Sequence, residues 1–383
     1  MARQSSLINA LSSQETALVS EVPGTTTDPV YKAMEILPVG PVCFIDTAGL
    51  DDEGALGELR IKRTIRVLSH ADVALLVIDS TNFTEEFEEG ILEKIQSTGI
   101  PVVAVINKSD ISSNGSNIKK LLEKWNLSCV KVSSKTKSGI EELKEKIIEA
   151  AKPEALEPPI AGDLIKPGDT VITVIPVDKS APKGRLILPQ VMTIRDILDH
   201  DGRAIMVKED QLLDTIKNLK EPPRLVITDS QVIDRVRRDT PCGILFTSFS
   251  ILFARYRGDI NTLVEGAKAV ENLIPGDEIL IAEACTHHPT SDDIGRSKIP
   301  RWLNARAGGA LNFNYCVGGD FPPDLHRYKL VIHCGACMIN RKAMLQRIME
   351  ARKCNVPIVN YGVLISYIHN VLEDALKCLK LHG

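Results

Sequence analysis

The sequence predicts an α/β protein of several domains, on two observations. At 383 residues the chain is longer than one hydrophobic core usually supports. Short apolar runs that end in a polar residue alternate with amphipathic stretches. The runs are Val42–Asp46, Val73–Asp79 and Val102–Asn107, and the stretches include Leu56–Ser69 and Glu85–Thr98. Such alternation is typical of a parallel, doubly wound sheet, which binds ligands at the carboxyl ends of its strands.

Composition excludes several classes of protein. Hydrophobic residues make up 44% and charged residues 25%, as in soluble globular proteins. We find no apolar run of about 18 residues, the length a membrane-spanning helix needs, and the opening residues lack a secretory signal pattern. The net charge of −4 disfavours a nucleic-acid binder, which usually has a basic surface. We therefore expect a cytoplasmic protein that binds neither membrane nor nucleic acid.

A segment with four prolines is expected to separate the first domain from the rest of the chain. Residues 153–169 show little periodicity, as a linker does. We therefore expect domains at 1–152, 170–258 and 259–383. The middle domain repeats the strand–helix alternation without a catalytic cluster, so its simplest role is packing or dimerisation. Its expected strands are Thr170–Val177, Ala204–Lys208, Arg224–Thr228 and Ile244–Thr247.

Four short motifs occur in the order that a GTP-binding domain requires. In Gly24–Asp28, a threonine hydroxyl can reach Mg²⁺ while its backbone contacts the γ-phosphate. In Asp46–Gly49, the carboxylate can hold Mg²⁺ through water, and the glycine lets a backbone N–H approach the γ-phosphate. In Asn107–Asp110, the last carboxylate can accept hydrogen bonds from guanine N1 and N2. Ser133–Lys135 would support the contact to guanine O6.

Each motif has a simpler interpretation taken alone, since Asp46 could cap a helix and Gly24 could serve a turn. All of them in order, within an α/β pattern, favour a GTP site. Ser5 is added as the expected hydroxyl ligand of Mg²⁺. The residues expected to bind GTP and Mg²⁺ are Ser5, Thr25, Thr26, Asp46, Gly49, Asn107, Lys108, Asp110, Ser133, Ser134 and Lys135.

These motifs resemble those of the Era and TrmE type of GTPases. Leu50 comes directly after Gly49 and cannot orient water by hydrogen bonding. The resemblance implies that backbone groups and a bound cation, often K⁺, position the attacking water instead. Catalytic residues for GTP hydrolysis are not assigned.

The phosphate-binding loop departs from that family. Ser5–Leu11 matches the residues C-terminal to the loop lysine, but Arg3 and Gln4 stand where Gly-Lys is expected. Either the chain lacks the loop, and nucleotide binding and hydrolysis are impaired, or the sequence is incomplete at this end. The second interpretation is favoured because the missing segment would also contain a central β-strand. Its loss would leave backbone groups unpaired in the core.

The cysteines, nine in all, crowd the C-terminal third, which in a cytosolic chain indicates metal binding before disulfides. Glu278–Ala284 is expected to be a strand that leads into Cys285-Thr286-His287, and Tyr328–His333 a strand that leads into Cys334 and Cys337. A Cys-x-x-Cys turn brings two thiolates to one metal. Spacing alone is equally compatible with zinc and with an iron–sulfur cluster. A Cys334–Cys337 disulfide would leave Cys285 and the histidines unexplained.

The remaining cysteines have weaker assignments. Lone cysteines are usually inert core residues, and four are placed in that class: Cys43, Cys129, Cys242 and Cys378. Cys316 and Cys354 receive no assignment. Val363–Leu379 is expected to be one amphipathic helix.

Cys-x-His and then His-Cys-x-x-Cys, coupled to these GTPase motifs, resemble the pattern of the HydF family. The resemblance implies a P-loop-type GTPase sheet, then an α/β dimerisation domain and an α/β iron–sulfur domain. It also implies a [4Fe–4S] cluster with three cysteine ligands and one exchangeable iron site. The implied ligands are Cys285, Cys334 and Cys337, with His287, His333 or Glu283 as candidates for the fourth position.

By that resemblance, the chain is a scaffold in [FeFe]-hydrogenase maturation. It would accept a diiron precursor from two radical-SAM maturases and deliver it to apo-hydrogenase. GTP turnover would regulate these associations, and the protein would be a dimer. The alternative is an Era- or TrmE-like GTPase that acts on RNA and has a zinc-stabilised C-terminal module.

Overall fold

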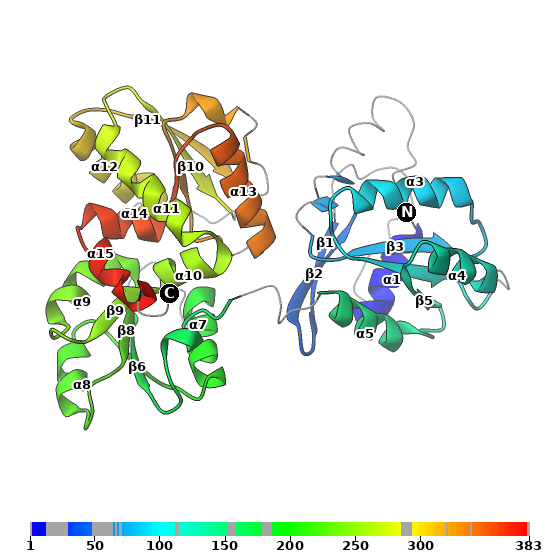
Figure 1. Ribbon diagram of the computed structural model, residues 1–383, viewed down its shortest axis with the longest axis horizontal. Coiled ribbons are helices and arrows are strands. Elements are labelled where there is room, and N and C mark those ends of the chain that lie inside the picture. Colours follow the sequence, from blue (N-terminus) through cyan, green and yellow to red (C-terminus); the bar gives the residue numbers. More distant parts are fainter. Residues whose placement is uncertain are drawn as a thin grey trace. The chain divides into compact units, whose positions relative to one another are not determined.

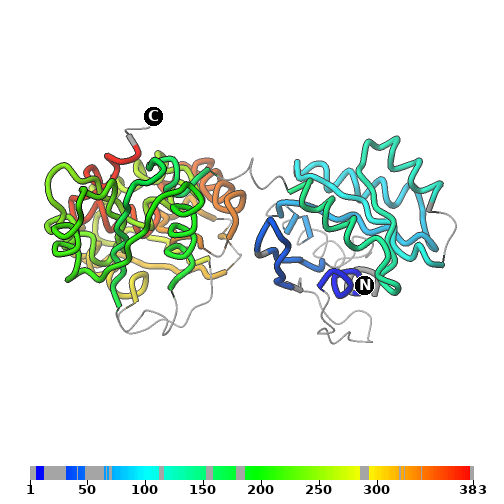
Figure 2. Tube along the Cα trace, turned by 90° about the horizontal axis from the view of Figure 1, so that it is seen from below, coloured from blue at the N-terminus to red at the C-terminus, as the bar shows by residue number. Residues whose placement is uncertain are grey.

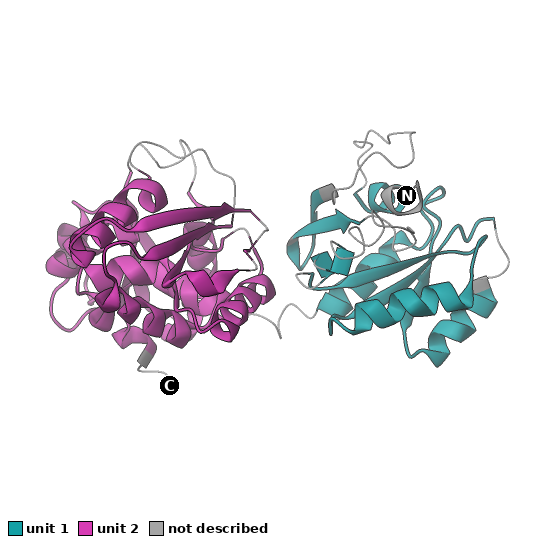
Figure 3. Ribbon diagram, turned by 90° about the horizontal axis from the view of Figure 1, so that it is seen from above, with its two compact units in different colours: residues 1–156 teal, residues 157–383 magenta. Residues whose placement is uncertain are grey.

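The computed structural model describes residues 2–12, 30–47, 64–65, 67–68, 71–111, 115–151, 158–177, 186–284, 293–318, 321–322, 324–337 and 339–380. The chain forms two compact units, Met1–Leu156 and Glu157–Gly383 (Figure 3). Both are α/β, as predicted. Within the described ranges, no helix is long and apolar enough to cross a membrane.

The described residues of unit 1 form two sheets (Figure 1). β1 (Val30–Ile36) and β2 (Gly40–Asp46) form an antiparallel pair. β3 (Ala74–Asp79), β4 (Val102–Asn107) and β5 (Ser128–Lys131) form a parallel sheet. We expected the run at 42–46 to be a parallel strand, and this is wrong. A short apolar run has no feature that distinguishes the two directions of pairing.

Helices cover both faces of the parallel sheet of unit 1. The helices are α1 (Ala2–Ser12), α3 (Glu85–Gln96), α4 (Gly115–Lys124) and α5 (Ile140–Ala151). Alternate residues of a strand point to opposite faces. Val103 and Val105 of β4 therefore pack with α1 and α5, while Ala104 and Ile106 pack with α3 and α4.

In the part of unit 2 that the structure describes, two four-stranded parallel sheets have the same strand order. The first sheet runs β7-β6-β8-β9, and the second runs β11-β10-β12-β13. In each, the first strand along the chain is central and the second lies at the edge. The strands are β6 (Thr170–Val174), β7 (Arg203–Val207), β8 (Leu225–Thr228), β9 (Leu245–Ser248), β10 (Glu278–Glu283), β11 (Asn312–Val317), β12 (Leu330–His333) and β13 (Ile358–Asn360).

Helices connect these strands, as parallel pairing requires. They are α7 (Leu188–Asp199), α8 (Leu212–Asn218), α9 (Ile233–Asp239), α10 (Phe249–Arg257), α11 (Ile260–Ala267), α12 (Ile299–Ala307), α13 (Arg341–Lys353), α14 (Tyr361–Ile368), α15 (Leu372–Ala375) and α16 (Lys377–Lys380), together with the short helices η1 (Gly162–Leu164), η2 (Ser230–Val232), η3 (Lys268–Asn272), η4 (Ile294–Lys298) and η5 (Leu325–Arg327). The single helix expected at 363–379 is broken into α14, α15 and α16. Asn370 has a left-handed φ of 57°, which no helix can continue through.

The two sheets of unit 2 share one hydrophobic core. Ile172 and Val226 of the first sheet belong to the same buried cluster as Ile279 and Ile332 of the second. The end of the chain ties them further, because α15 and α16 return to contact β9 (Figures 1 and 2). Arg237 Nε on α9 donates to Asp374 Oδ2 on α15 at 2.7 Å. The described residues between 170 and 380 therefore pack as one body.

Residues 158–169, which we expected to belong to the linker, fold onto unit 2. Ile160 and Leu164 are buried in its core. The Asp196 carboxylate accepts hydrogen bonds from the backbone N–H groups of Ala161 and Gly162, at 2.7 and 2.6 Å. Arg255 donates to the carbonyl oxygen of Ile160 at 2.8 Å. Side chains distant in sequence therefore hold residues 158–169 against unit 2. The prolines of this segment alone could not predict that it belongs to unit 2 and not to a linker.

Candidate nucleotide and cluster sites

Asn107 joins the two loops expected to recognise guanine. It ends β4 and is 2% exposed. Its Oδ1 accepts from Lys108 N at 2.8 Å, from Ser134 N at 3.2 Å and from Ser134 Oγ at 3.0 Å. The motif 107–110 and the segment 133–135 are therefore brought together, as the sequence predicted. Beside them, Ser133 Oγ accepts from Thr136 N at 3.1 Å and closes its loop.

Lys108 contacts a carboxylate that the sequence motifs did not indicate. Its Nζ lies 2.8 Å from Asp79 Oδ2, and the Asp79 side chain is 1% exposed. Asp79 Oδ1 accepts from Thr81 N and Thr81 Oγ1 at 2.9 and 2.6 Å. Asp79 ends β3 as Asn107 ends β4, so its strand-terminal position was the available signal. Lys108 also has a left-handed φ of 61°, a constrained conformation for a non-glycine residue.

Asp110 and Lys135 are exposed at this edge of the sheet. An exposed carboxylate beside a rigid loop can accept hydrogen bonds from a base, so the position of Asp110 suits the predicted contact with guanine N1 and N2. Asp46 lies at the end of β2. Ser5 lies in α1, but its side chain is outside the described part, as are Thr25, Thr26 and Gly49. The predicted phosphate contacts therefore stay predictions.

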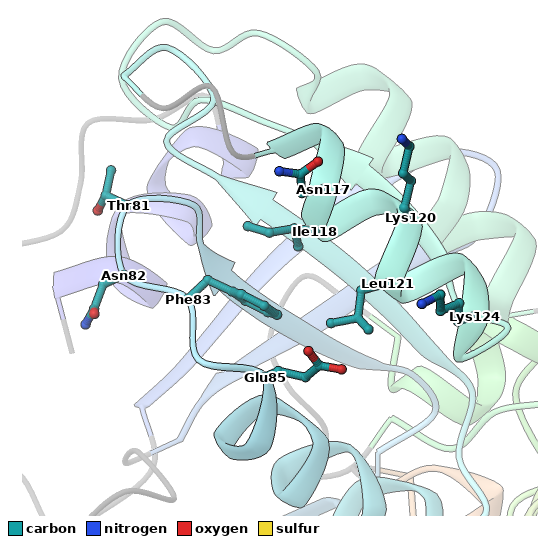
Figure 4. Close-up of a pocket in the computed structure, with 9 residues that line it drawn as sticks. All are labelled: Thr81, Asn82, Phe83, Glu85, Asn117, Ile118, Lys120, Leu121 and Lys124. Atoms are coloured by element: carbon teal, nitrogen blue, oxygen red, sulfur yellow. The ribbon is translucent and has the colours of Figure 1, made fainter.

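A cleft of about 520 Å³ opens between the loop after β3 and helix α4 (Figure 4). The Phe83 ring points across it toward Leu121, and Glu85, Lys120 and Lys124 lie on its rim. Its lining includes none of the residues predicted to bind GTP. We therefore do not assign the nucleotide to this cleft.

The second sheet of unit 2 places three of the predicted cluster residues, Glu283, His333 and Cys334, at its carboxyl end. Ala282, His333 and Asn360 are paired across β10, β12 and β13. The next residue along each strand points to the opposite face, because side chains alternate along a strand. The ladder continues through the Cys334 N–H, which donates to Ala282 O at 2.8 Å. Glu283 and Cys334 are therefore neighbours on one face, and His333 lies on the other.

The Cys334–Cys337 segment forms a tight turn at that edge. Ala336 within it is buried and has a left-handed φ of 57°, which costs free energy for a residue with a Cβ. Cys334 Sγ accepts a hydrogen bond from Ala284 N at 3.1 Å. Burial raises the pKa of the Cys337 thiol, and the nearby Arg257 charge opposes that rise. Hydrogen bonds to sulfur also occur in iron–sulfur sites, where they help to set the reduction potential of the cluster.

Glu283 is a buried carboxylate beside Cys334. It is 2% exposed. Arg296 Nη2 donates to its Oε2 at 3.0 Å, and the Tyr361 hydroxyl donates to its Oε1 at 3.4 Å. Burial raises the pKa of Tyr361, and the charges of Glu283 and Cys334 raise it further, so the hydroxyl stays protonated as a donor. Glu283 is therefore held from two sides.

His333 is engaged through both ring nitrogens. Its Nδ1 lies 2.9 Å from the Cys334 carbonyl oxygen, so Nδ1 carries the proton and donates. Nε2 then accepts from Arg347 Nη1 at 2.7 Å. Burial lowers the pKa of His333 to about 3, and the Arg347 charge adds to the effect. Arg347 Nη2 also donates to Gly318 O at 2.9 Å. The buried Arg347 therefore links His333 on β12 to the end of β11.

The third predicted cysteine ligand, Cys285, and the candidate His287 lie outside the described residues. Among the residues that are described, no group of three or more His, Cys, Asp or Glu side chains is placed to hold a metal ion. The described part of the site still fits a thiolate-bound group, because Cys334 receives an N–H donor and Cys337 stands at the end of the same tight turn.

The other cysteines differ in exposure. Cys378 is buried, as expected, and Cys129 is half-buried. Cys43 and Cys242 are exposed, so their assignment to the core is wrong. Cys43 lies in the middle of β2, paired in register with Ala33, and Cys242 lies in the turn before β9. An apolar context in the sequence does not require burial at either position. Cys316 pairs in register with Ala282 and thus lies on the face of His333.

Three family models match successive parts of the chain. Residues 160–258 match the Hydrogen maturase F dimerization domain, and residues 261–378 match the Hydrogen maturase F tetramerization domain. The chain belongs to the HydF family. Residues 4–108 match a third model, the 50S ribosome-binding GTPase, as the GTPase motifs predicted.

Curated relatives match over a smaller part of the chain. The tRNA modification GTPase MnmE of Prochlorococcus marinus (strain NATL2A) is 42% identical over 145 residues, 37% of this chain and 30% of that protein. The GTPase Der of Sulfurihydrogenibium sp. (strain YO3AOP1) is 39% identical over 163 residues, 38% of this chain and 35% of that protein. The chain thus spans about a third of the length of these relatives.

Among solved structures, Era in complex with MgGDPNP and nucleotides 1506–1542 of 16S ribosomal RNA is similar at 21% identity. The match covers 54% of this chain and 90% of that one, with a TM-score of 0.35. Similarity at that level supports no conclusion about the fold or the ligand.

Proposed function

We propose that this HydF-family chain is a GTP-hydrolysing scaffold for maturation of [FeFe]-hydrogenase, and that it carries a [4Fe–4S] cluster. The observation that carries the proposal is the Cys334–Cys337 turn at the carboxyl end of β12. In that turn, a backbone N–H from the end of β10 donates to Cys334 Sγ. Ligands of open α/β sheets bind at this edge.

The proposed ligands are Cys285, Cys334 and Cys337. Cys334 Sγ accepts from the N–H of Ala284, the residue before Cys285 in the sequence, and this supports the proposal of Cys285 as the third ligand. When bound, a cluster with three thiolate ligands supplies an iron with an exchangeable site for the diiron precursor. Of the candidate fourth ligands, Glu283 lies on the face of Cys334, whereas His333 points to the other face and is engaged with Arg347.

Anaerobic purification, combined with iron, zinc and acid-labile sulfide analysis, tests the cluster. We expect iron and sulfide in near-equal amounts and an EPR signal of a reduced [4Fe–4S] cluster. Stoichiometric zinc without labile sulfide would contradict the proposal, because a closed tetrahedral zinc site has no exchangeable position.

The guanine contact of Asp110 is tested by changing the base and the side chain together. Asp110→Asn should weaken GTP binding by about 2–4 kcal/mol, because hydrogen bonds to a charged acceptor are lost. The same variant should bind xanthosine triphosphate better than the wild type does, since its amide can donate to xanthine O2. Fluorescent nucleotide titration measures both. Equal GTP affinity in the two proteins would show that Asp110 does not read the base. The wild-type titration also shows whether Arg3 and Gln4, in place of Gly-Lys, leave nucleotide binding impaired, and phosphate release from GTP shows the same for hydrolysis.

Mg²⁺ and a K⁺ ion are proposed to bind together with GTP. A comparison of the GTP hydrolysis rate in K⁺ and in Na⁺ tests the role of K⁺.

We further propose a cytoplasmic homodimer that binds radical-SAM maturases and apo-hydrogenase. Anaerobic co-purification with each partner tests these associations. The match of residues 160–258 and 261–378 to the HydF domains disfavours the alternative of an RNA-directed GTPase with a zinc module.

A further inference from the structure

Asp79 and Asn107 end neighbouring strands of unit 1 in register, so their side chains share a face of the sheet. Lys108 follows Asn107, and a continued strand would direct its side chain to the opposite face. The left-handed φ of 61° at Lys108 ends the strand there, and Lys108 Nζ lies 2.8 Å from Asp79 Oδ2. The lysine side chain therefore reaches from the end of β4 to the end of β3.

The Asp79 carboxylate is itself held in one orientation. Its Oδ1 accepts from Thr81 N and from Thr81 Oγ1, at 2.9 and 2.6 Å. Oδ2 is thereby directed at Lys108, and the Asp79 side chain is only 1% exposed. An ion pair with a buried partner is screened less by water and salt than a surface pair. Asp79 is therefore a fixed partner for a long, flexible side chain.

The backbone of Lys108 is held from the same loop. Ser80 Oγ donates to Lys108 O at 3.1 Å, and Ser80 N donates to Asn107 O at 3.2 Å. A left-handed backbone costs free energy for a residue with a Cβ, and these hydrogen bonds offset part of that cost. Asp79 and Ser80, at the end of β3, therefore hold both the side chain and the backbone of Lys108.

Lys108 is one of the residues proposed to contact GTP, whereas Asp79 lies outside the four motifs that predicted the site. The Lys108 side chain lies at the carboxyl ends of β3 and β4, the edge at which open α/β sheets bind ligands. A lysine loses side-chain entropy when a ligand orders it. We propose that Asp79 is a positioning residue that orders Lys108 before the nucleotide binds and thereby raises the affinity for GTP. This inference rests on the proposed GTP site.

Asp79→Asn tests the proposal at the atom that makes the contact. The variant keeps an Oδ1 that accepts from Thr81, and it replaces the Oδ2 that faces Lys108 with a neutral amide group. The Kd of fluorescent GTP and GDP analogues should rise roughly threefold to tenfold, because binding must then order a long side chain. The hydrolysis rate at saturating GTP should stay within about twofold, since the proposed phosphate contacts belong to other residues.

A double-mutant cycle shows whether Asp79 acts through Lys108. Lys108→Met removes the ammonium group and should also raise the Kd for GTP. Adding Asp79→Asn to Lys108→Met should not raise the Kd further, because the side chain that Asp79 positions is gone. A carboxylate that only stabilised the fold would instead weaken binding by the same factor in both backgrounds.

Glu141→Gln is the matched control. It breaks the contact of Glu141 with Lys144 on α5, a lysine–carboxylate pair that also measures 2.8 Å but whose carboxylate side chain is 82% exposed. The Kd for GTP should be unchanged in this variant. Trp125 fluorescence in a Trp302→Phe background reports whether unit 1 is folded in each protein.

The outcomes separate this inference from the proposed GTP site. A wild-type chain that binds neither GTP nor GDP would overturn both. If the wild type binds GTP and folded Asp79→Asn binds it with the same Kd, the role of Asp79 alone is overturned. A further rise in Kd on adding Asp79→Asn to Lys108→Met would also overturn it. An unchanged Kd in Lys108→Met would do so without any change at Asp79, because positioning an uninvolved lysine has no effect.

Discussion

The two sheets of unit 2 have the same strand order but different residues at the carboxyl ends of their strands. At the carboxyl end of the first sheet, Val174, Thr228 and Ser248 are paired in register. At the corresponding positions of the second sheet stand Ala282, His333 and Asn360. The first row is apolar or hydroxylic, whereas the second has a buried imidazole bound to a buried arginine. The topology is shared, so the chemistry comes from the residues at the strand ends.

The next position along the third strand shows the difference most clearly. In the first sheet it is Asp229, whose Oδ1 accepts from Gln231 N at 3.2 Å and so caps a short helix. In the second sheet it is Cys334, which starts the Cys-x-x-Cys turn. In the first sheet this residue caps a helix, and in the second sheet it carries a thiol at the carboxyl end of the strand.

The largest expected effect comes from changing these corresponding positions. Cys334→Ser should lose nearly all cluster iron, because one thiolate ligand is removed. Asp229→Asn should keep full iron content, since asparagine also caps helices. Iron and sulfide per chain measure both. Retained iron in Cys334→Ser would show that Cys334 is not a cluster ligand, so that changing either strand end leaves the iron content unchanged.

The next effect concerns the buried arginine that packs at the second sheet. Arg347→Met should lower the free energy of unfolding of unit 2 by about 2–4 kcal/mol, because His333 Nε2 and Gly318 O lose their donor. Thr228→Val, at the position that corresponds to His333, should cost about 1 kcal/mol or less.

Urea unfolding measures these changes in a Trp125→Phe background. Of the two tryptophans, Trp125 lies in unit 1 and Trp302 in unit 2, so the remaining fluorescence reports on unit 2. If Arg347→Met and Thr228→Val lowered the free energy of unfolding equally, the carboxyl ends of the two sheets would not differ in their contribution to stability.

A smaller effect is expected for self-association. Around the first sheet, α7 exposes Leu188, Val191 and Leu198, which share one helix face, and the edge strand β7 exposes Met206. Leu198→Glu should weaken dimerisation by about 1.5–3 kcal/mol, the value of burying one such side chain. Met349→Glu, on α13 beside the second sheet, should leave the dimer intact. Sedimentation equilibrium distinguishes these results, and the reverse pattern would place the dimer contact on the second sheet.

The smallest effect tests what the sheets have in common. Each fourth strand ends in a residue that caps the next helix: Ser248 Oγ accepts from Ile251 N, and Asn360 Oδ1 accepts from Val363 N. Ser248→Ala and Asn360→Ala should each cost about 1 kcal/mol of stability. Asn360 should cost slightly more, because its Nδ2 also donates to Ser250 O at 3.3 Å. A null effect at either position in urea unfolding would mean that the shared topology does not rely on these caps.

Much of the fold was predictable from periodicity, and the misses have physical causes. β4 has the bounds that its apolar run predicted, Val102–Asn107. β13 spans only three residues, Ile358–Asn360, too few to show a period. β11 is an edge strand with exposed positions, so its apolar signal is weak. In the candidate site, Asp79 and Arg296 were missed because each acts through a partner distant in sequence.

The sequence by itself determined the α/β class, the order of the GTPase motifs and the Cys-x-x-Cys turn, because these depend on local spacing and residue type. Only the tertiary structure decided that Glu283 and Cys334 share a face while His333 lies on the other. That outcome depends on the register between β10 and β12, and a shift of one residue would reverse it. Register is set by the packing of the whole sheet, which no short motif encodes.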